Sequence, residues 1–500
     1  MRIMDITDFF TSPRYVLALV VIVFTIWYMR RKRYSKPLPP GPTPWPLIGN
    51  LPLFVQKGIP FHKVAKMLQG KYGNIVKVHA GPATLIFLMG KETVHKATHE
   101  MNDKFKYRPT NIFLIKHIFQ NKGILFSNGE VNSALRKYAL GTMREFGVGK
   151  RSLEERIQEE AGILCQVLES KNGQPSYFMN NFKMAASNII AGIVYGNRFE
   201  YDDPVFKRLL SDIDTLFKNG SLTLPENFLP LLRFLPGSRL KKLEEQFKDL
   251  ESYARTQIED HRTTFDPENV RDFVDMFLKM EGSGDPFMTE DNLHRVIVEL
   301  FNAGTDTTAN TIVWGILLLI TYPDTQKKLR AEILKVVGTE RYIRLEDKRN
   351  MPYLRAFLDE VQRFSGVAPQ TPPHTVLEDT EFEGYTIPKN SNVIFILFTL
   401  LHDADVWGDP DNFRPERFLN DAGEYVELNK DSFIPFSAGG RSCIGKHLAR
   451  MELLLFFGTL VQKFEFKAPP GADLPSLERI QSGVTCQTKP YDICAVPFSQ

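Results

Sequence analysis

The residues with the clearest chemical potential surround one cysteine, in the segment FSAGGRSCIGKHLAR that runs from Phe436 to Arg450. Three glycines flank Cys443, which lets the backbone approach something large and flat and then turn sharply. We expect a helix to begin near Cys443, so that its amide N–H groups and its dipole face the sulfur and favour the thiolate. A thiolate in that position is a strong axial donor to haem iron and helps to cleave an O–O bond. Arg441 could meet a haem propionate through a charge-assisted hydrogen bond.

Two other interpretations apply to the same segment. Cys443 and His447 are four residues apart on one helical face, a spacing that could ligate zinc, but no second pair of cysteines or histidines accompanies them. A buried cysteine beside a glycine turn is often only a small core residue. The pattern of the whole segment argues against both.

The segment resembles the cysteine loop of the cytochrome P-450 superfamily, Phe-x-x-Gly-x-Arg-x-Cys-x-Gly. Its fixed positions are matched by Phe436, Gly439, Arg441, Cys443 and Gly445. The resemblance implies a P-450 fold, with a large helical domain and a small β-rich domain. It also implies haem b (iron protoporphyrin IX) as the cofactor, with Cys443 as its axial metal ligand.

A long helix is expected further upstream. Thr289, followed by two acids, is a good N-cap, and Pro323 ends the helical pattern. The helix would have about 30 residues and a length of ~45 Å. Gly304 and three threonines weaken its interior, which suggests a local opening where a ligand or water enters the hydrogen-bond ladder.

The segment AGTDTT at 303–308 of this helix resembles the oxygen-binding motif of the same family. The resemblance makes Asp306 and Thr307 the catalytic acid and alcohol, which route protons through water to the distal oxygen. An exposed polar stripe on a helix is the alternative.

Three more residues resemble the partners of the haem propionates: Arg108 in the sequence YRP, Arg136, and His374 after two prolines. Similar animal microsomal members carry a Trp four residues before the arginine that corresponds to Arg136. Here that position is Asn132, so one indole–propionate hydrogen bond should be missing.

Glu360 and Arg363 are three residues apart, a spacing that alone favours a solvated surface pair. With Arg417 of the segment PERF they match the buried structural triad of the family. We therefore expect them to support the core behind the cysteine loop.

An uncharged apolar run extends from Tyr15 to Met29. It would span roughly 22 Å, a little less than a bilayer core of about 27–30 Å. Two Lys or Arg residues precede the run and five follow it, which places the rest of the chain in the cytosol. A cleaved signal peptide is the alternative, but the charges lie on the wrong side and no cleavage site follows.

The expected organisation is a membrane anchor at 1–34, a proline-rich hinge at 35–50 and one haem-binding catalytic domain at 51–500. Residues 74–89 predict a small sheet, residues 130–365 are helical in pattern, and short strands return after 374, so the class is mostly α with minor β. The apolar, proline-broken stretch from Leu222 to Leu235 resembles the loop that enters the bilayer in membrane-bound members, with ordinary core as the alternative.

The composition is that of an ordinary globular protein, with 43% hydrophobic and 24% charged residues. A net charge of +3 over 500 residues gives no reason to expect a nucleic-acid partner. Four scattered cysteines cannot form a disulfide framework, which favours a reducing compartment.

The resemblance implies a monooxygenase of the animal microsomal branch, on the cytosolic face of the endoplasmic reticulum membrane. It would insert one atom of O₂ into a steroid, fatty acid, terpenoid or xenobiotic. No flavin or dinucleotide motif occurs in the chain, so electrons from NADPH would arrive through a diflavin reductase, with cytochrome b5 open as a further donor. The reductase would dock near Cys443, where Lys137, Lys446 and Arg450 offer positive charge.

Two rival functions are a reductase-independent haem-thiolate isomerase or dehydratase acting on peroxides, and a non-catalytic lipophile- or haem-binding protein. The intact pair Asp306 and Thr307 argues against both. The expected substrate pocket is apolar, which indicates a lipophile and leaves its identity and regiochemistry undetermined. Its residues are Ile112, Phe113, Phe119, Leu216, Phe217, Asn302, Ala303, Val367, Ala368 and the turn from Val484 to Cys486.

Overall fold

The computed structural model describes residues 34–54, 60–148, 151–220, 224–281, 284–428 and 431–498, together with Tyr15, Leu17, Ala18 and Val21. The anchor predicted at 1–34 therefore lies almost entirely outside the described residues. Among the helices that are described, none has the length and apolar character needed to cross a bilayer.

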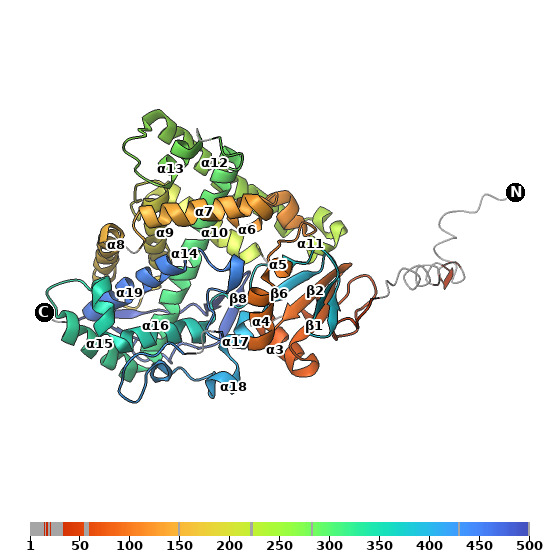
Figure 1. Ribbon diagram of the computed structural model, residues 1–500. Helices are drawn as coiled ribbons and strands as arrows, with labels where there is room; N and C mark the ends of the chain where they lie inside the picture. The colour runs from red at the N-terminus through yellow and green to blue at the C-terminus, as the bar shows by residue number, and fades with distance from the viewer. Residues whose placement is uncertain are drawn as a thin grey trace.

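The described chain is mostly helical with small sheets, as the sequence predicts (Figure 1). The longer helices are α3 (Phe61–Tyr72), α7 (Gly129–Glu145), α8 (Arg151–Glu169), α9 (Met179–Val194), α10 (Pro204–Asn219), α12 (Arg239–Thr264), α14 (Glu290–Thr321), α15 (Pro323–Val337), α16 (Pro352–Ser365) and α19 (Lys446–Lys463). Shorter ones include α4 (Lys91–His95), α5 (Asn102–Phe105), α6 (Gly123–Phe126), α11 (Pro225–Phe228), α13 (Phe273–Glu281), α17 (Leu397–Leu401) and α18 (Ala404–Trp407).

One sheet of four strands lies to one side of the helices (Figure 1). Its strand order is β1 (Ile75–Ala80), β2 (Ala83–Leu88), β6 (Asn392–Phe395) and β3 (His374–Thr375). The β1–β2 hairpin matches the sheet predicted at 74–89, and β2 pairs in parallel with β6. Two-stranded sheets join β4 (Thr380–Phe382) to β5 (Tyr385–Ile387), β7 (Phe464–Lys467) to β10 (Cys494–Pro497), and β8 (Arg479–Ser482) to β9 (Thr485–Thr488).

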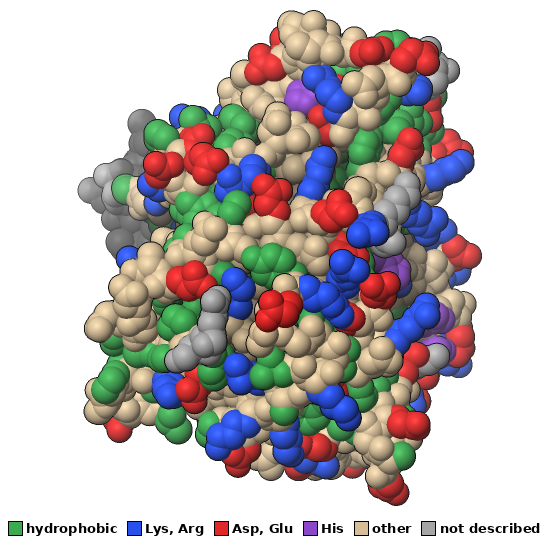
Figure 2. Space-filling view, turned by 90° about the vertical axis from the view of Figure 1, so that its left-hand side faces the viewer, with side chains coloured by type: hydrophobic (Ala, Val, Ile, Leu, Met, Phe, Trp, Pro, Cys, Tyr) green, Lys and Arg blue, Asp and Glu red, His purple; other side chains and the backbone are tan. Residues whose placement is uncertain are grey.

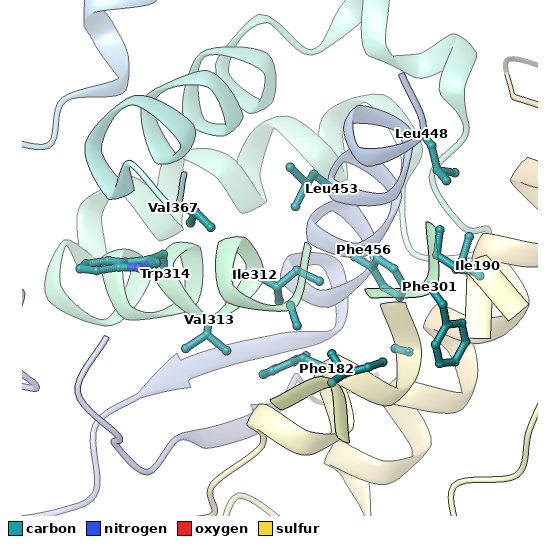
Figure 3. Packing of buried hydrophobic residues seen from close by; sticks show 14 of the residues in the cluster. Phe182, Ile190, Phe301, Ile312, Val313, Trp314, Val367, Leu448, Leu453 and Phe456 are labelled. Atoms are coloured by element: carbon teal, nitrogen blue, oxygen red, sulfur yellow. The ribbon is translucent and has the colours of Figure 1, made fainter. Parts of the chain in front are cut away.

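Helix α14 is the structural axis of the helical part (Figure 1). The Thr289 side chain caps it by accepting from the Asn292 amide, and Pro323 opens the next helix, as predicted. Figure 3 shows part of the packing that buries it: Phe301 lies beside Ile190 of α9, and Phe456 comes from α19.

The local opening predicted in α14 is wrong, because the helix is continuous from Glu290 to Thr321. The hydroxyls of Thr305 and Thr307 are satisfied within the helix, since they donate to the carbonyls four residues earlier. Gly304 has a packing reason, since a Cβ there would lie 2.6 Å from the Ile190 side chain.

Residues 34–50 of the proline-rich segment form no helix, and the segment is fixed to the sheet. The Lys77 amide donates to Pro40 O at 2.8 Å, and the Thr386 amide donates to Pro37 O at 2.9 Å. Gly41 approaches β1 so closely that a Cβ there would lie 1.8 Å from Lys77 O. Residues 37–41 are therefore attached at a defined place on the sheet.

Basic and acidic side chains are interspersed on the face seen in Figure 2, without a field of one sign. That distribution suits the near-neutral charge of the sequence.

Candidate functional site

The cysteine loop closes on itself before α19 begins. The Cys443 amide donates to Phe436 O at 2.9 Å, and the helix starts at Lys446 with Gly445 as its N-cap. The helix therefore starts near Cys443, as predicted, but the Cys443 amide itself bonds back to Phe436 instead of entering the helix. The amides of Gly445 and Lys446 nevertheless hydrogen-bond the Cys443 sulfur, as the sequence led us to expect.

Burial raises the pKa of the Cys443 thiol, although those two amides and the positive charge of Arg136 oppose the rise. The two amides favour the thiolate, as predicted, but desolvation outweighs them, so the pKa of the thiol is raised. A metal that binds the sulfur would displace the proton.

We infer an internal space between the cysteine loop and α14, because both keep accessible surface although protein surrounds them. The Cys443 residue is exposed to solvent although protein surrounds it closely enough to raise its pKa. In the middle of α14, Ala303 is exposed and Thr307 is partly exposed, while Thr305 and Asp306 are 0% exposed. One stripe of an otherwise buried helix therefore faces this space.

Four basic side chains predicted as propionate partners gather at its edge. Thr375 N donates to Tyr107 O, which brings Arg108 beside His374. Arg108 donates to the carbonyls of Leu125, Pro372 and Pro373. His374 hydrogen-bonds Phe105 O at 2.8 Å through Nδ1.

The two other arginines join the same group. Arg136 donates to Ser442 O, and Arg441 donates to the carbonyls of Lys106, Ile124 and Ser127. Burial, and then the charge of Arg136, lower the pKa of Arg441 to about 10. Burial, followed by the charges of Arg441 and Arg136, lowers the pKa of Arg108.

Glu299 opposes the lowering of both pKa values, but repulsion among the cations remains, so the group holds more positive than negative charge. A group with two carboxylates placed here would relieve it, since guanidinium and carboxylate form the strongest charged hydrogen bonds in proteins. The residues present therefore fit haem: an accessible sulfur for the iron and a basic group for its propionates.

One glycine of the loop, Gly439, has a steric reason, whereas Gly445 has none. Gly439 has φ +71° and approaches α4–α5, so that a Cβ there would lie 2.2 Å from Thr98 O. A Cβ at Gly445 would lie 3.9 Å from the Cys443 sulfur, at van der Waals distance. The aromatic ring of Phe436 lies 5.5 Å from the Arg450 guanidinium.

Asn132, the residue that departs from the family pattern, is buried and does not face the arginines as a donor. Its Nδ2 donates to Ile124 O at 2.6 Å and to Ser127 Oγ at 3.3 Å. Arg441 also donates to Ile124 O and to Ser127 O. Asn132 thus helps to hold the same short segment that Arg441 holds.

Thr307 and Asp306 point in different directions. Thr307 lies on the accessible stripe and donates to Ala303 O at 2.7 Å, which leaves its oxygen able to accept. Asp306 faces away, accepting from Thr485 Oγ1 at 3.1 Å and lying 3.1 Å from Lys183 Nζ. Burial raises the pKa of Asp306, and Lys183 opposes the rise.

Three residues close to the accessible stripe of α14 were not predicted from the sequence as part of the site. Lys183 of α9 also pairs with Asp214, and nothing in the sequence links it to Asp306. Glu452 of α19 accepts from Thr308 at 3.1 Å, and burial raises its pKa to about 8. Glu299 stands eight residues before Thr307 on the same helical face, a spacing that could have revealed it.

The structural triad is confirmed. Glu360 and Arg363 are 0% exposed, with Arg363 Nε 2.7 Å and Arg417 Nε 3.0 Å from the same Glu360 oxygen. Arg363 also donates to Leu401 O and Pro410 O. The triad ties α16 to the segments that lead towards the cysteine loop.

The turn predicted to line the pocket packs against two other predicted pocket segments. The Cys486 amide donates to Val367 O at 2.9 Å. Gly483, at φ +60°, approaches the end of α10 so closely that a Cβ there would collide with Phe217 O. Phe119 stacks on Phe126 with ring centroids 4.7 Å apart.

The zinc alternative gains no support. Among the described residues, one cluster has three side chains placed to hold a metal, and it consists of His261, Asp272 and Asp275. Neither Cys443 nor His447 belongs to it.

An accessible cysteine, a basic group beside it and a long helix that offers a threonine across an internal space together define a haem-thiolate protein. The family model of cytochrome P450 matches residues 39–495. Cytochrome P450 2B2 of Rattus norvegicus is 39% identical over 97% of this chain and 99% of that protein. Cytochrome P450 2B4 of Oryctolagus cuniculus is 39% identical over 91% and 93%, and cytochrome P450 2K1 of Oncorhynchus mykiss is 37% identical over 97% and 98%. The chain belongs to the cytochrome P450 family of haem-thiolate monooxygenases.

Proposed function

We propose that this protein inserts one atom of O₂ into a lipophilic substrate, with electrons delivered from NADPH by a separate diflavin reductase. The observation that carries the proposal is the accessible Cys443 thiol beside a group of arginines whose positive charge is only partly balanced, by Glu299. Cys443 would ligate the iron, and Arg108, Arg136, Arg441 and His374 would hold the propionates. Bound haem supplies the activation of O₂ and the transfer of one oxygen atom.

The residues of α14 would manage protons. The Thr307 oxygen can accept a hydrogen bond from water because its own proton is donated to Ala303 O. Asp306 is held by Lys183 behind this stripe, so it would act by exchanging a proton with water when that pair opens.

The direct test of the ligand is Cys443→Ser, which should abolish the red-shifted absorbance band of the ferrous-CO thiolate haem. Cys165→Ser, Cys486→Ser and Cys494→Ser are matched controls, since these cysteines lie elsewhere and should keep the band. Loss of the band in a control but not in Cys443→Ser would refute the assignment.

A rival activity is the rearrangement of a peroxide without reductase. With reductase present, a monooxygenase consumes NADPH and O₂ and releases a hydroxylated product. Turnover of a lipid hydroperoxide without NADPH, and no product with it, would favour the rival.

The reductase would dock on the basic surface around the start of α19. Lys446, Arg450, Arg144 and Lys348 all lower the pKa of His447 by their charges, after burial. These residues and Lys137 would attract an acidic partner. Whether cytochrome b5 is needed would follow from product formation with and without it.

The protein would be attached to the endoplasmic reticulum membrane with its catalytic domain in the cytosol. Exposed apolar residues at two neighbouring places support the attachment. Leu231 and Phe234 are 82% and 85% exposed, and Leu47 is 85% exposed. Gly81 links the two places, since its amide donates to Ile48 O and a Cβ there would touch Leu229. A chain truncated before Lys36 should still float partly with phospholipid vesicles, and Leu231→Ser with Phe234→Ser should reduce that fraction.

A further inference from the structure

Two histidine side chains lie against each other where α4 passes into the short π-helix η2 (Lys96–Glu100). His95 ends α4 and His99 lies in η2, and their rings are stacked with centroids 4.4 Å apart and planes 18° apart. Residues four apart overshoot one turn of an α-helix, which takes about 3.6 residues, and the wider π turn removes most of that overshoot. The Met101 amide shows the wide turn, since it donates to Lys96 O, five residues earlier, at 2.8 Å. The local winding therefore brings the two imidazoles together.

A carboxylate from a distant segment faces the first of these rings. Asp431 Oδ1 lies 3.3 Å from His95 Nδ1, and the side chains of Asp431 and His95 are 45% and 37% exposed. The Nδ1 atom itself is buried and makes no hydrogen bond with any described residue. A buried nitrogen without a partner is costly and uncommon in native proteins. The nitrogen and the oxygen thus face each other without the hydrogen bond that usually joins such a pair.

The separation of these two atoms suits ligands of one metal ion. Zinc binds histidine nitrogen and carboxylate oxygen at about 2.0–2.2 Å with tetrahedral angles, which places neighbouring ligand atoms about 3.3–3.5 Å apart. The 3.3 Å between His95 Nδ1 and Asp431 Oδ1 falls within this range. An ion bound to both atoms would satisfy the nitrogen and the carboxylate together.

The ring of His99 supplies a third ligand atom. Its Nδ1 lies 3.3 Å from His95 O and 3.1 Å from Thr98 Oγ1. With the proton assigned to Nδ1 and donated to His95 O, Nε2 keeps its lone pair, which is the arrangement that prepares histidines to bind metals. His99 is exposed, so a change of rotamer can bring Nε2 to the ion without disturbing the core.

We propose that His95, His99 and Asp431 bind a divalent transition-metal ion of the zinc class, with water as the fourth ligand. Imidazole nitrogen selects such ions over Ca²⁺ and Mg²⁺, which prefer oxygen ligands. The inference stands on these three residues alone and goes beyond the proposed monooxygenase function.

The cluster of His261, Asp272 and Asp275 is a poorer metal site, although its three ligand atoms lie closer together. Arg271 already holds Asp275 through Nε at 2.6 Å and Nη2 at 2.8 Å. The guanidinium neutralises the carboxylate and would place a second positive charge beside the ion.

A bound ion would connect two segments that lead to the cysteine loop. Asp431 stands five residues before Phe436, where the loop begins. On the other side, Gly439 packs so closely on η2 that a Cβ there would lie 2.2 Å from Thr98 O. The ion would therefore fix the start of the loop against η2 and stabilise the folded chain.

The test uses the full-length, haem-loaded protein without a histidine tag, so that iron already occupies Cys443, and Zn²⁺ as the probe. Isothermal titration calorimetry should detect Zn²⁺ binding that His95→Gln, His99→Gln and Asp431→Asn each weaken by at least about tenfold. Zn²⁺ at about a hundred times its Kd should raise the melting temperature of the wild type by about 2–3 °C. The rise should disappear in the three variants, and Mg²⁺ should not produce it.

His117→Gln is the matched control, because His117 is an exposed histidine of another π-helix, η3 (Leu114–Ile118), and packs on Phe113. It should bind Zn²⁺ like the wild type. All variants should keep the ferrous-CO band, which shows that they fold, and His99→Gln alters an exposed side chain that the core does not need. Unchanged Zn²⁺ affinity in His99→Gln, or binding that is lost in His261→Gln instead, would overturn the inference.

Discussion

Replacing Lys183 by methionine would remove the cation beside Asp306 while keeping a side chain of similar length. Lys183 is 5% exposed and Asp306 is 0% exposed, with 3.1 Å between Nζ and Oδ1. Removing one partner of a buried pair leaves an uncompensated charge, which typically costs about 3–5 kcal/mol. We expect Lys183→Met to lose stability on that scale, because only Thr485 still donates to Asp306.

The pH dependence follows from the direction of the Asp306 shift. Burial raises its pKa above the unfolded value, and the loss of Lys183 removes the main opposing effect. A carboxyl whose folded pKa is raised stabilises the fold below the unfolded pKa and loses that contribution as the pH rises through the folded pKa. The deficit of Lys183→Met should therefore be larger at pH 8 than at pH 5.

The measurement is the free energy of unfolding in urea for the haem-loaded protein, in a double-mutant cycle with Asp306→Asn. Lys328→Met is the control, since Lys328 and Glu416 pair 2.8 Å apart with side chains 60% and 40% exposed; its cost should stay below about 1 kcal/mol. A loss in Lys183→Met no larger than in the control, or no coupling to Asp306→Asn, would refute the buried-pair argument.

Three further outcomes are expected. Thr307→Ala should keep haem and substrate binding but divert reducing equivalents to peroxide, with product formation reduced by about 10²–10⁴-fold; unchanged coupling of NADPH to product would remove Thr307 from the mechanism. Burial lowers the pKa of His261, but the hydrogen bond and charge interaction with Asp272 outweigh burial, so the pKa is raised. The stability lost in His261→Gln should therefore be greatest below about pH 6.5 and should shrink as the pH rises through the raised pKa. A loss of stability that grows with pH in urea unfolding would contradict this. Asn219 should carry no glycan in cells although its Asn-Gly-Ser acceptor is complete; a glycosidase-sensitive mass shift absent from Asn219→Gln would reverse the proposed orientation.

Local patterns of the sequence predicted much of the fold. The bounds of α14 were predictable from Thr289 and Pro323, because a side-chain cap and a proline ring both act on the backbone within a few residues. The β1–β2 hairpin and the helix-free hinge were predictable for the same reason. The spacing of Glu360 and Arg363 could not separate a surface pair from a buried one without the family resemblance.

The cysteine loop was identifiable because five residues of defined type fall within ten positions. The direction of the pKa shift of Cys443 was not predictable, since it depends on how much protein surrounds the sulfur. The start of α19 depended on a hydrogen bond between residues 443 and 436 that no helical pattern contains.

The sequence by itself therefore determined the family, the cysteine that can hold the haem and the helix that faces it, because these depend on residue types at short spacings. Only the tertiary structure decided that Asp306 turns towards Lys183, and that Glu299 meets the amides of α6. These contacts join segments more than 100 residues apart in the chain. Their partners are chosen by the packing of α9, α6 and β9 around α14, which no local pattern encodes.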